Sequence, residues 1–394
     1  MQKRSYYLDW VRVVSIGLVF LFHCGRFFDH EDWHVKNNAT SELATQAIFF
    51  MSRWIMPLFF FISGASTWFA LHGKTPGSFS KSRLKRIAVP LIFGILALSP
   101  PQVYLERLSH HQFAGSFFEF LPHYFEGWYA FGGNFAWMGL HLWYLLLLLV
   151  FSLAGLPLFR LYRKYIPQGL KATPITLILC MLVLTLTGTF LDPDGIIGNR
   201  MWGGWSMVEH FVVFMMGFML FSDAGLALRL EKRRHLFLVA AIVLSMAVMI
   251  PNPVSALSYG EPWYAAKMLI RTAHCMSCVF TILGFAHLHL NSGGSRLKKL
   301  NESVLPFYIL HQAVMVPVGY YVVNPSWMMA IKYLVTAATS FAVILLVYAV
   351  IRRSNALRFV FGMSSRTGSV ASQIVKRPER ELASNSSGIT CCQV

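Results

Sequence analysis

The sequence predicts an all-α polytopic membrane protein with about ten transmembrane helices and both termini in the cytoplasm. The prediction rests on the composition, on the length of the apolar runs and on the placement of the basic residues. Of the 394 residues, 56% are hydrophobic and only 13% are charged, and the mean hydropathy is +0.53. An ordinary soluble domain is about 45–50% apolar and about 25% charged. The composition therefore excludes a soluble enzyme, a disordered chain and a disulfide-rich secreted scaffold.

Apolar runs of roughly 20 residues indicate spanning helices, and their length and lack of strict alternation exclude a barrel. The first run contains Asp9, Arg12 and His23 and is followed by no small-residue cleavage site, so we interpret it as a helix and not as a signal peptide. We predict ten spans, at about 7–28, 45–71, 84–105, 137–158, 174–191, 206–222, 235–251, 263–290, 303–323 and 328–351.

The net charge of +17 comes from 34 Lys and Arg residues against 17 Asp and Glu residues. Of the 34 basic residues, 25 lie before the first run, in the even-numbered connections or after the last run. Three lie in the odd-numbered connections and six lie in or at the ends of spans. Cytoplasmic segments of membrane proteins carry such an excess of basic residues. The bias predicts cytoplasmic termini and an even number of spans, and it leaves no need for a nucleic-acid partner.

Residues 1–352 are predicted to form the transmembrane domain, and residues 353–394 a disordered cytoplasmic tail rich in Ser and basic residues. Cys275 and Cys278 are one helical turn apart within a span, which favours packing over a redox or zinc site. The sequence contains no phosphate-binding Gly-rich loop and no HExxH motif. No metal site and no resident cofactor are therefore predicted.

The first helix carries ionisable groups along one face. Arg12 and His23 are eleven residues apart, which is three turns plus about 20° and roughly 16 Å along the axis. Asp9 lies three residues before Arg12, where the two can pair. Ionisable groups at membrane depth are costly and mark functional sites. This face of the helix predicts a cationic site at Arg12, near the cytoplasmic end, and a titratable site at His23, in the outer half of the membrane. The alternative is that His23 has only a structural role.

A second cationic site opens the third span. Arg83 and Arg86 are one helical turn apart and are followed by Pro90. Two guanidinium groups on one face suit a clamp on phosphate groups, although such clusters usually serve topology alone. Together with Arg12 they predict an anionic ligand on the cytoplasmic side.

The external connections are rich in aromatic residues. Eight of the eleven Trp residues lie in or beside them, and the long segment 106–136 adds His, Phe and Tyr residues. An aromatic belt is expected at both membrane interfaces. The excess on the outer side is therefore consistent with a surface on which sugar rings stack, or with a plain belt.

Five segments of the sequence resemble motifs of the membrane-bound acyltransferase-3 family and occur in the same order as in that family. The run from Leu8 to His23 looks like its Arg-x10-His signature. Further segments that resemble family motifs are residues 59–64 (FFFISG), 83–86 followed by Pro90 (RLKR), 141–145 (HLWYL) and 307–312 (FYILHQ). The resemblance spans residues 5–350 and looks closest to the branch that succinylates periplasmic glucans.

The resemblance implies an enzyme of the cell membrane, in bacteria the inner membrane, that moves an acetyl or succinyl group from cytoplasmic acyl-CoA to a hydroxyl of an extracytoplasmic carbohydrate. Arg12, Arg83 and Arg86 would bind the acyl-CoA phosphates. His23 would remove the hydroxyl proton as the oxygen attacks the thioester, and desolvation favours the neutral imidazole that a base requires. Direct transfer and a covalent acyl-His intermediate both stay open. The candidates for substrate positioning, each with helix packing as the alternative, are Asp9, His141, Trp143 and His311.

Two alternatives come from other functional classes. A proton-coupled secondary transporter of a small anionic solute would also place ionisable groups along a helix. The sequence shows neither an inverted repeat nor paired broken helices, which argues against it. A membrane scaffold without chemistry would bind no acyl-CoA. The sequence identifies neither the acyl group, nor the carbohydrate, nor the oligomeric state.

Overall fold

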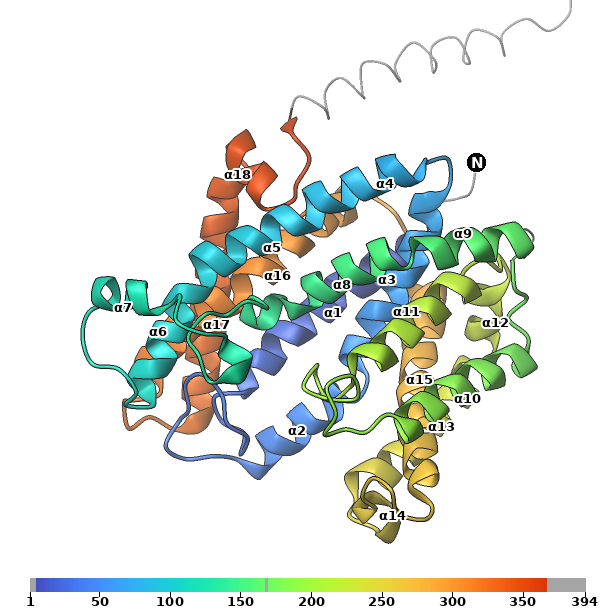
Figure 1. Ribbon diagram of the computed structural model, residues 1–394, viewed down its shortest axis with the longest axis horizontal. Helices are drawn as coiled ribbons and strands as arrows, with labels where there is room; N and C mark the ends of the chain where they lie inside the picture. The colour runs from blue at the N-terminus through green and yellow to red at the C-terminus, as the bar shows by residue number, and fades with distance from the viewer. Residues whose placement is uncertain (1–4, 167–168, 367–394) are drawn as a thin grey trace, which may run out of the picture.

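The computed structural model describes residues 5–166 and 169–366. In chain order its helices are α1 (Tyr6–Gly25), α2 (Glu42–Ser52), α3 (Ile55–Leu71), α4 (Pro76–Arg83), η1 (Leu84–Ala88), α5 (Val89–Phe93), η2 (Gly94–Leu98), α6 (Ser99–Ser109), α7 (Phe117–His123), η3 (Tyr129–Phe131), η4 (Leu140–Leu142), α8 (Trp143–Ala154), α9 (Leu156–Tyr165), α10 (Pro174–Phe190), α11 (Met207–Leu220), α12 (Leu226–Lys232), α13 (Arg234–Met249), α14 (Pro253–Ala256), α15 (Tyr264–His289), α16 (Ser295–Val322), α17 (Met329–Ile351) and α18 (Asn355–Val360). The described residues contain no strand, only an isolated bridge between Trp202 and Trp205. The predicted all-α class is confirmed. Figure 1 shows α2 and α14 at one end of the molecule, and α4 and α18 at the opposite end.

Six helical segments of the described chain are long and apolar enough to cross a membrane. A seventh results if η4 with α8 and the following α9, which meet at an angle of 48°, form one broken span. Three further apolar helices, α10, α11 and α13, are shorter. The chain is therefore a helical membrane protein, and the count of about ten spans stays a prediction. The six long segments are residues 6–25, 42–71, 76–109, 264–289, 295–322 and 329–351.

Several helix boundaries differ from the hydropathy prediction. The helix α16 begins at Ser295, eight residues before the predicted 303, because its first two turns are polar and hydropathy does not detect them. The third segment begins at Pro76 and contains two π-helical turns, η1 and η2. The break between α8 and α9 lies at Gly155, followed by a proline at the first turn of α9. Such backbone changes depend on packing and not on mean hydropathy.

Capping residues set where two of these helices begin. The Thr75 hydroxyl accepts a hydrogen bond from the backbone N–H of Ser78, and Pro76 occupies the first turn of α4, where no N–H donor is needed. At α11, Ser206 and Glu209 form a reciprocal capping box that pairs backbone N–H groups with the two side chains. The capping box also fixes the Glu209 carboxylate at the start of the helix.

The helices α3 and α11 pack with their backbones in close approach. A Cβ atom at Gly64 would lie 1.9 Å from the Phe214 carbonyl oxygen, and one at Gly217 would lie 1.9 Å from the Phe61 carbonyl oxygen. Small residues permit this approach, which is the usual way that helices associate in a membrane. The glycine of the segment 59–64 is therefore explained by packing, and α3 is held as one wall of the cavity described below.

The first part of the predicted tail is ordered. The helix α18 begins after Ser354, whose side chain accepts from the Leu357 N–H. Arg358 is buried, pairs with Glu302 of α16 and donates to the Ser364 carbonyl at 2.7 Å. The folded chain thus extends past residue 352, and the rest of the predicted tail, residues 367–394, lies outside the described residues.

Candidate active site

A cavity of about 410 Å³ lies between α1, α3, the α4–η1 segment, α8 and α16. We call it the basic cavity, because four cationic side chains line it and no Asp or Glu does. On α16 its lining extends from Asn301 to Tyr308, and on α1 from Arg12 to Val19. Each pair spans seven residues, or about 10 Å of helix. The four cations of the lining are Arg12, Lys74, Arg83 and Arg86.

Arg12 is held at the wall of this cavity by two neighbours. Its Nη1 donates to the Asp9 carboxylate at 2.8 Å, which confirms the predicted pairing, and its Nη2 donates to the Ser66 hydroxyl of α3. Asp9 is buried and Arg12 is half-buried. The carboxylate compensates the charge of the guanidinium and orients it, so Asp9 contributes by positioning Arg12.

The predicted clamp lines the same cavity. Arg83 donates from Nη2 to the Thr67 hydroxyl of α3 at 2.9 Å, and its guanidinium lies 4.8 Å from the centroid of the Phe79 ring. Arg86 follows in the π-helical turn η1 and is exposed. The cavity thus brings Arg83, Arg86 and Arg12 together. Lys74 joins them; it is one of the basic residues in the connection between the predicted spans 45–71 and 84–105.

The opposite end of the basic cavity is apolar and aromatic. Phe59, Tyr144 and Tyr308 line it, and the Tyr144 hydroxyl lies 2.6 Å from the Ser63 hydroxyl. The Tyr308 hydroxyl donates to the backbone carbonyl of His141. One end of the cavity therefore suits phosphate groups, and the other suits a thin, less polar chain.

His23 lies one helical turn beyond Val19, the last residue of α1 that lines the cavity. Its Nδ1 lies 2.8 Å from the Val19 carbonyl oxygen, so Nδ1 carries the proton and donates to it. The neutral ring then has its lone pair on Nε2, which makes no hydrogen bond to a described residue. The side chain is half-buried. This is the arrangement of a positioned base with a free acceptor nitrogen.

A second histidine lies against His23. The Nε2 of His311, from α16, is 3.3 Å from the Nδ1 of His23, and the two ring centroids are 4.9 Å apart. The Nδ1 of His311 donates to the Tyr308 carbonyl at 2.6 Å. His141 packs edge-on against His311 at 4.9 Å and donates from Nε2 to the Ile309 carbonyl at 3.2 Å. The structure thus brings His311 directly to His23, and His141 to His311.

Trp143 is not brought to this cluster. Its ring packs against Phe60, Trp202 and His210, with centroids 5.6–6.2 Å apart. Trp143 is two positions after His141, which turns the two side chains to different faces of the helix. The aromatic packing of Trp143 with α3 and α11 explains the residue without a substrate.

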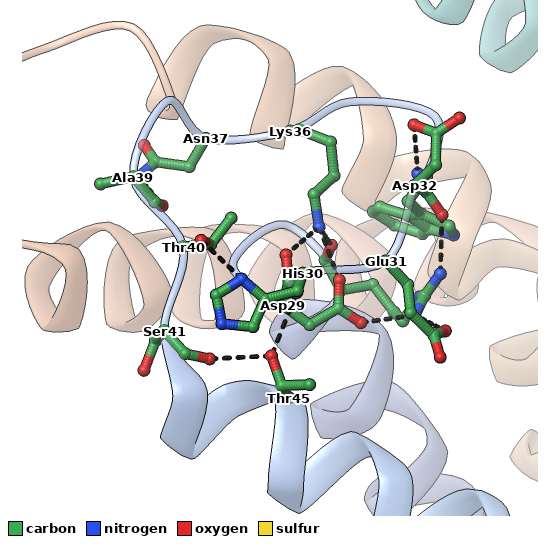
Figure 2. Close-up of polar contacts among 12 residues, drawn as sticks. Asp29, His30, Glu31, Asp32, Lys36, Asn37, Ala39, Thr40, Ser41 and Thr45 are labelled. Atoms are coloured by element: carbon green, nitrogen blue, oxygen red, sulfur yellow. Dashed lines mark hydrogen bonds and ion pairs between the residues drawn. The ribbon is translucent and has the colours of Figure 1, made fainter.

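A loop of residues 26–41 covers the region beside His23. Lys36 holds it in shape: its Nζ donates to the Asp29 carboxylate and backbone carbonyl, both at 2.6 Å, and to the Arg26 carbonyl at 2.8 Å. Figure 2 shows Lys36 reaching across the loop to Asp29, and Thr45 of α2 bonded to Ser41. The loop presents Trp33, whose ring centroid lies 6.2 Å from that of His23.

The next residue of this loop begins a buried polar network. The Nδ1 of His34 donates to the Glu106 carboxylate, and its Nε2 accepts from the Gln312 amide at 2.9 Å. The Tyr129 hydroxyl donates to both Glu106 oxygens, at 2.6 and 2.7 Å. Burial and the adjacent carboxylate raise the pKa of Tyr129, so its phenol stays protonated and remains a donor. Because Gln312 directly follows His311 on α16, its hydrogen bond to His34 holds His34 close to His311.

The sequence did not single out His34 or Glu106, because 72 residues separate them and no local motif joins them. Gln312 was visible only as the last residue of the segment 307–312. Glu106 could have been found from the sequence, because it is a carboxylate within the apolar segment 76–109. A carboxylate in such a segment is costly to bury and therefore marks a functional or paired residue.

Comparison with known proteins supports the resemblance drawn from the motifs. Residues 5–349 match the family described as "Acyltransferase domain". The chain is 22% identical over 377 residues to the glucans biosynthesis protein C of Salmonella schwarzengrund (strain CVM19633), covering 91% of this chain and 94% of that protein. Proteins of the same name from Salmonella typhi and Salmonella typhimurium show the same identity and coverage.

Proposed function

We propose, because the chain belongs to the acyltransferase-3 family, that it transfers an acyl group from cytoplasmic acyl-CoA to a hydroxyl group of an extracytoplasmic carbohydrate. The chain is a membrane-bound enzyme that transfers acyl groups other than aminoacyl groups. The observation that carries the proposal is the basic cavity, with four cations at one end and His23 one turn beyond the other.

The cationic end suits the phosphate groups of coenzyme A. Arg12 and Arg83 are oriented by side chains of α3, and Arg86 and Lys74 are exposed, so a ligand arriving from the aqueous side meets them first. Charge-assisted hydrogen bonds to phosphate are about twice as strong as neutral ones. Asp9 compensates the charge of Arg12, and the described residues place no ion-pair partner on Lys74, Arg83 or Arg86, so the lining stays positive toward a ligand.

The reacting end suits general-base catalysis by His23. As the acceptor hydroxyl oxygen bonds to the thioester carbon, Nε2 of His23 takes the hydroxyl proton. The C–S bond then breaks, and the departing thiolate receives the proton from Nε2. The Val19 carbonyl holds Nδ1–H throughout, so the same ring nitrogen acts as base and then as acid. Direct transfer of this kind needs no protein nucleophile.

The acceptor side consists of the loop 26–41 and the network behind it. Trp33 offers an aromatic face beside His23 on which a sugar ring can stack. His311 positions His23, and His141 in turn packs on His311. A carbohydrate acceptor is proposed because relatives of similar length are named for glucan biosynthesis. The acyl group proposed is acetyl or succinyl.

The proposed topology has ten spans. The three shorter apolar helices and the broken α8–α9 span join the six long segments. Both termini and the basic cavity mouth then lie in the cytoplasm, as the distribution of basic residues predicts, and loop 26–41 lies outside.

The test is release of free CoA by the purified chain in proteoliposomes, with acetyl-CoA or succinyl-CoA as donor and oligosaccharide glucan as acceptor. Acceptor-dependent release of CoA supports the proposal.

Arg86→Gln should weaken acyl-CoA binding about tenfold or more, since a charge-assisted hydrogen bond contributes about 1.5–3 kcal/mol. Lys85→Gln is the matched control, because Lys85 is the exposed neighbour that does not line the cavity. Solute uptake without CoA release, or equal affinities of the two variants, would contradict it.

A further inference from the structure

A second cationic cavity lies at the opposite end of the molecule from the cations of the basic cavity. It has a volume of about 390 Å³ and lies between α2, the α13–α14 segment and the first turns of α15. We call it the outer cationic cavity, because α2 and α14 lie at the end of Figure 1 opposite to α4, which ends at Arg83. Its cations are Arg53, Lys267 and Arg271, and no Asp or Glu of the described chain lines it.

These three cations belong to the six basic residues that the sequence places in or at the ends of spans. A charged side chain at membrane depth is costly and almost always has a polar partner. The other three members of the set follow this rule: Arg12 pairs with Asp9, Arg26 pairs with Asp29, and Lys332 donates to the Asn37 side chain at 2.7 Å. The partners of the cations in the outer cationic cavity are therefore informative.

Arg271 has a counter-ion. It pairs with the buried Glu209 carboxylate at 2.7 Å and donates to the Gly204 carbonyl at 2.6 Å. The same carboxylate also lies 3.9 Å from Nε of Arg200. One carboxylate thus serves two guanidinium groups, and none of its charge is left for the remaining cations of the cavity.

Arg53 and Lys267 have no counter-ion among the described residues. Arg53 forms no ion pair or hydrogen bond in the described chain, and its Nε is buried without an acceptor there. Its guanidinium lies 3.9 Å from the centroid of the Phe49 ring. Lys267 donates to the Leu257 carbonyl at 2.6 Å, which uses one of its three N–H donors. Half-buried donors without acceptors are costly, so the cavity is complementary to an anion.

Two carboxylates lie close enough to act on these cations through space, but each has a partner elsewhere. Glu31 pairs with Arg26 at 2.7 Å. Glu261 accepts a hydrogen bond from the backbone N–H of Ser258 at 2.7 Å. Neither forms an ion pair with a cation of the cavity, so the cavity stays positive toward a ligand.

The neutral polar side chains of the lining already donate to neighbouring groups; they are Thr45, Gln46, Asn252 and Ser255. The free donors are therefore those of Arg53 and Lys267. A guanidinium group presents a planar fork that fits two oxygens of a phosphate, and an ammonium group adds a point charge. The cavity volume falls in the range of about 300–1,000 Å³ that is typical of small-molecule sites. The site thus has room for more than an isolated ion.

The outer cationic cavity adjoins the loop that covers His23. Thr45 of α2 lines the cavity, and its hydroxyl accepts from the His30 backbone N–H of loop 26–41 at 3.1 Å (Figure 2). The same loop presents Trp33 to the His23 ring. One loop therefore contacts the cavity on one side and the reacting end on the other.

We propose that the outer cationic cavity binds a phosphate group carried by the carbohydrate acceptor, and so recognises a phosphorylated acceptor. The proposal rests on the proposed function for the identity of the acceptor and on the proposed topology for the side of the membrane. A phosphate monoester carries about −1.5 to −2 charges at pH 7 and three acceptor oxygens. It matches the two cations together, whereas a carboxylate supplies one charge and a neutral sugar none.

The first experiment measures binding without an acyl donor. Glucose 6-phosphate, glucose and inorganic phosphate are titrated into the purified full chain in detergent by calorimetry. Glucose 6-phosphate should bind about tenfold more tightly than glucose, because only the phosphate forms charge-assisted hydrogen bonds. Equal affinity for glucose would overturn the proposal. Inorganic phosphate binding as tightly, or displacement of the sugar phosphate by phosphatidylglycerol, would identify a free ion or a lipid headgroup as the ligand and would also overturn it.

Three variants assign the binding to this cavity. Arg53→Gln and Lys267→Gln should each weaken glucose 6-phosphate binding about tenfold, and two separate positions guard against a folding defect in one of them. Arg86→Gln is the matched control, because it removes one charge from the basic cavity and should leave the affinity for glucose 6-phosphate unchanged. Loss of binding in Arg86→Gln, with native binding in the other two variants, would place the sugar phosphate in the basic cavity and refute the assignment.

The second experiment connects the cavity to acceptor choice. CoA release is measured with gluco-oligosaccharides of one length, either neutral or carrying one phosphate monoester. The native chain should show about tenfold lower KM for the phosphorylated acceptor, and Arg53→Gln should remove that difference while it still acylates the neutral acceptor. Equal KM values in the native chain, or a difference that persists in Arg53→Gln, would overturn the proposal. No CoA release with either acceptor would contradict the proposed function instead, and the binding experiment would still decide the site.

Discussion

Replacing His23 tests the proposed chemistry most directly. The ring is fixed by the Nδ1–H bond to the Val19 carbonyl at 2.8 Å, and its Nε2 is free of described partners. A general base in this position contributes about 10²–10⁴-fold to the rate. His23→Ala should therefore lower kcat by that factor, or about 3–5.5 kcal/mol in activation free energy.

Binding of the donor should change little in the same variant. The lining of the basic cavity ends at Val19 on α1, one turn before His23, and its cations lie at the far end. The dissociation constant for acyl-CoA should therefore stay within about twofold. The assay is acceptor-dependent CoA release in proteoliposomes for kcat, with equilibrium binding of labelled acyl-CoA measured in parallel.

The matched control is His72→Ala. His72 makes the same kind of bond, from Nδ1 to the carbonyl of the fourth residue before it, Trp68, at 3.0 Å. It is exposed at the end of α3 and does not line the basic cavity. The control should retain native kcat. If His23→Ala retained kcat within about tenfold of native, removal of a hydroxyl proton by His23 would be refuted.

Two further predictions concern the acceptor side and the packing. Glu106→Gln removes the carboxylate that orients His34, and should raise KM for the acceptor severalfold while leaving the acyl-CoA dissociation constant unchanged; a changed donor affinity alone would contradict this assignment. Gly64→Ala places a Cβ 1.9 Å from the Phe214 carbonyl oxygen and should destabilise the chain by about 1–3 kcal/mol, lowering the thermal midpoint in detergent. Gly77→Ala, with no atom within 4 Å of the added Cβ, is its control and should not lower the midpoint.

The sequence by itself determined the class of protein and the core of the site. Apolar runs, basic connections and helical spacing are local properties, and they predicted the helical membrane protein, the Asp9–Arg12 pair and the cationic cluster of Arg12, Arg83 and Arg86. A helix has a fixed period, so residues three or eleven positions apart share a face whatever surrounds them. The family resemblance followed from the same local motifs.

Only the tertiary structure decided which side chains from distant helices meet. It placed His311 against His23 across 288 residues, paired His34 with Glu106, and turned Trp143 to a separate aromatic cluster. Such contacts depend on how helices pack and where their backbones deviate, as at the π-helical turn η1, and no local spacing in the sequence specifies either.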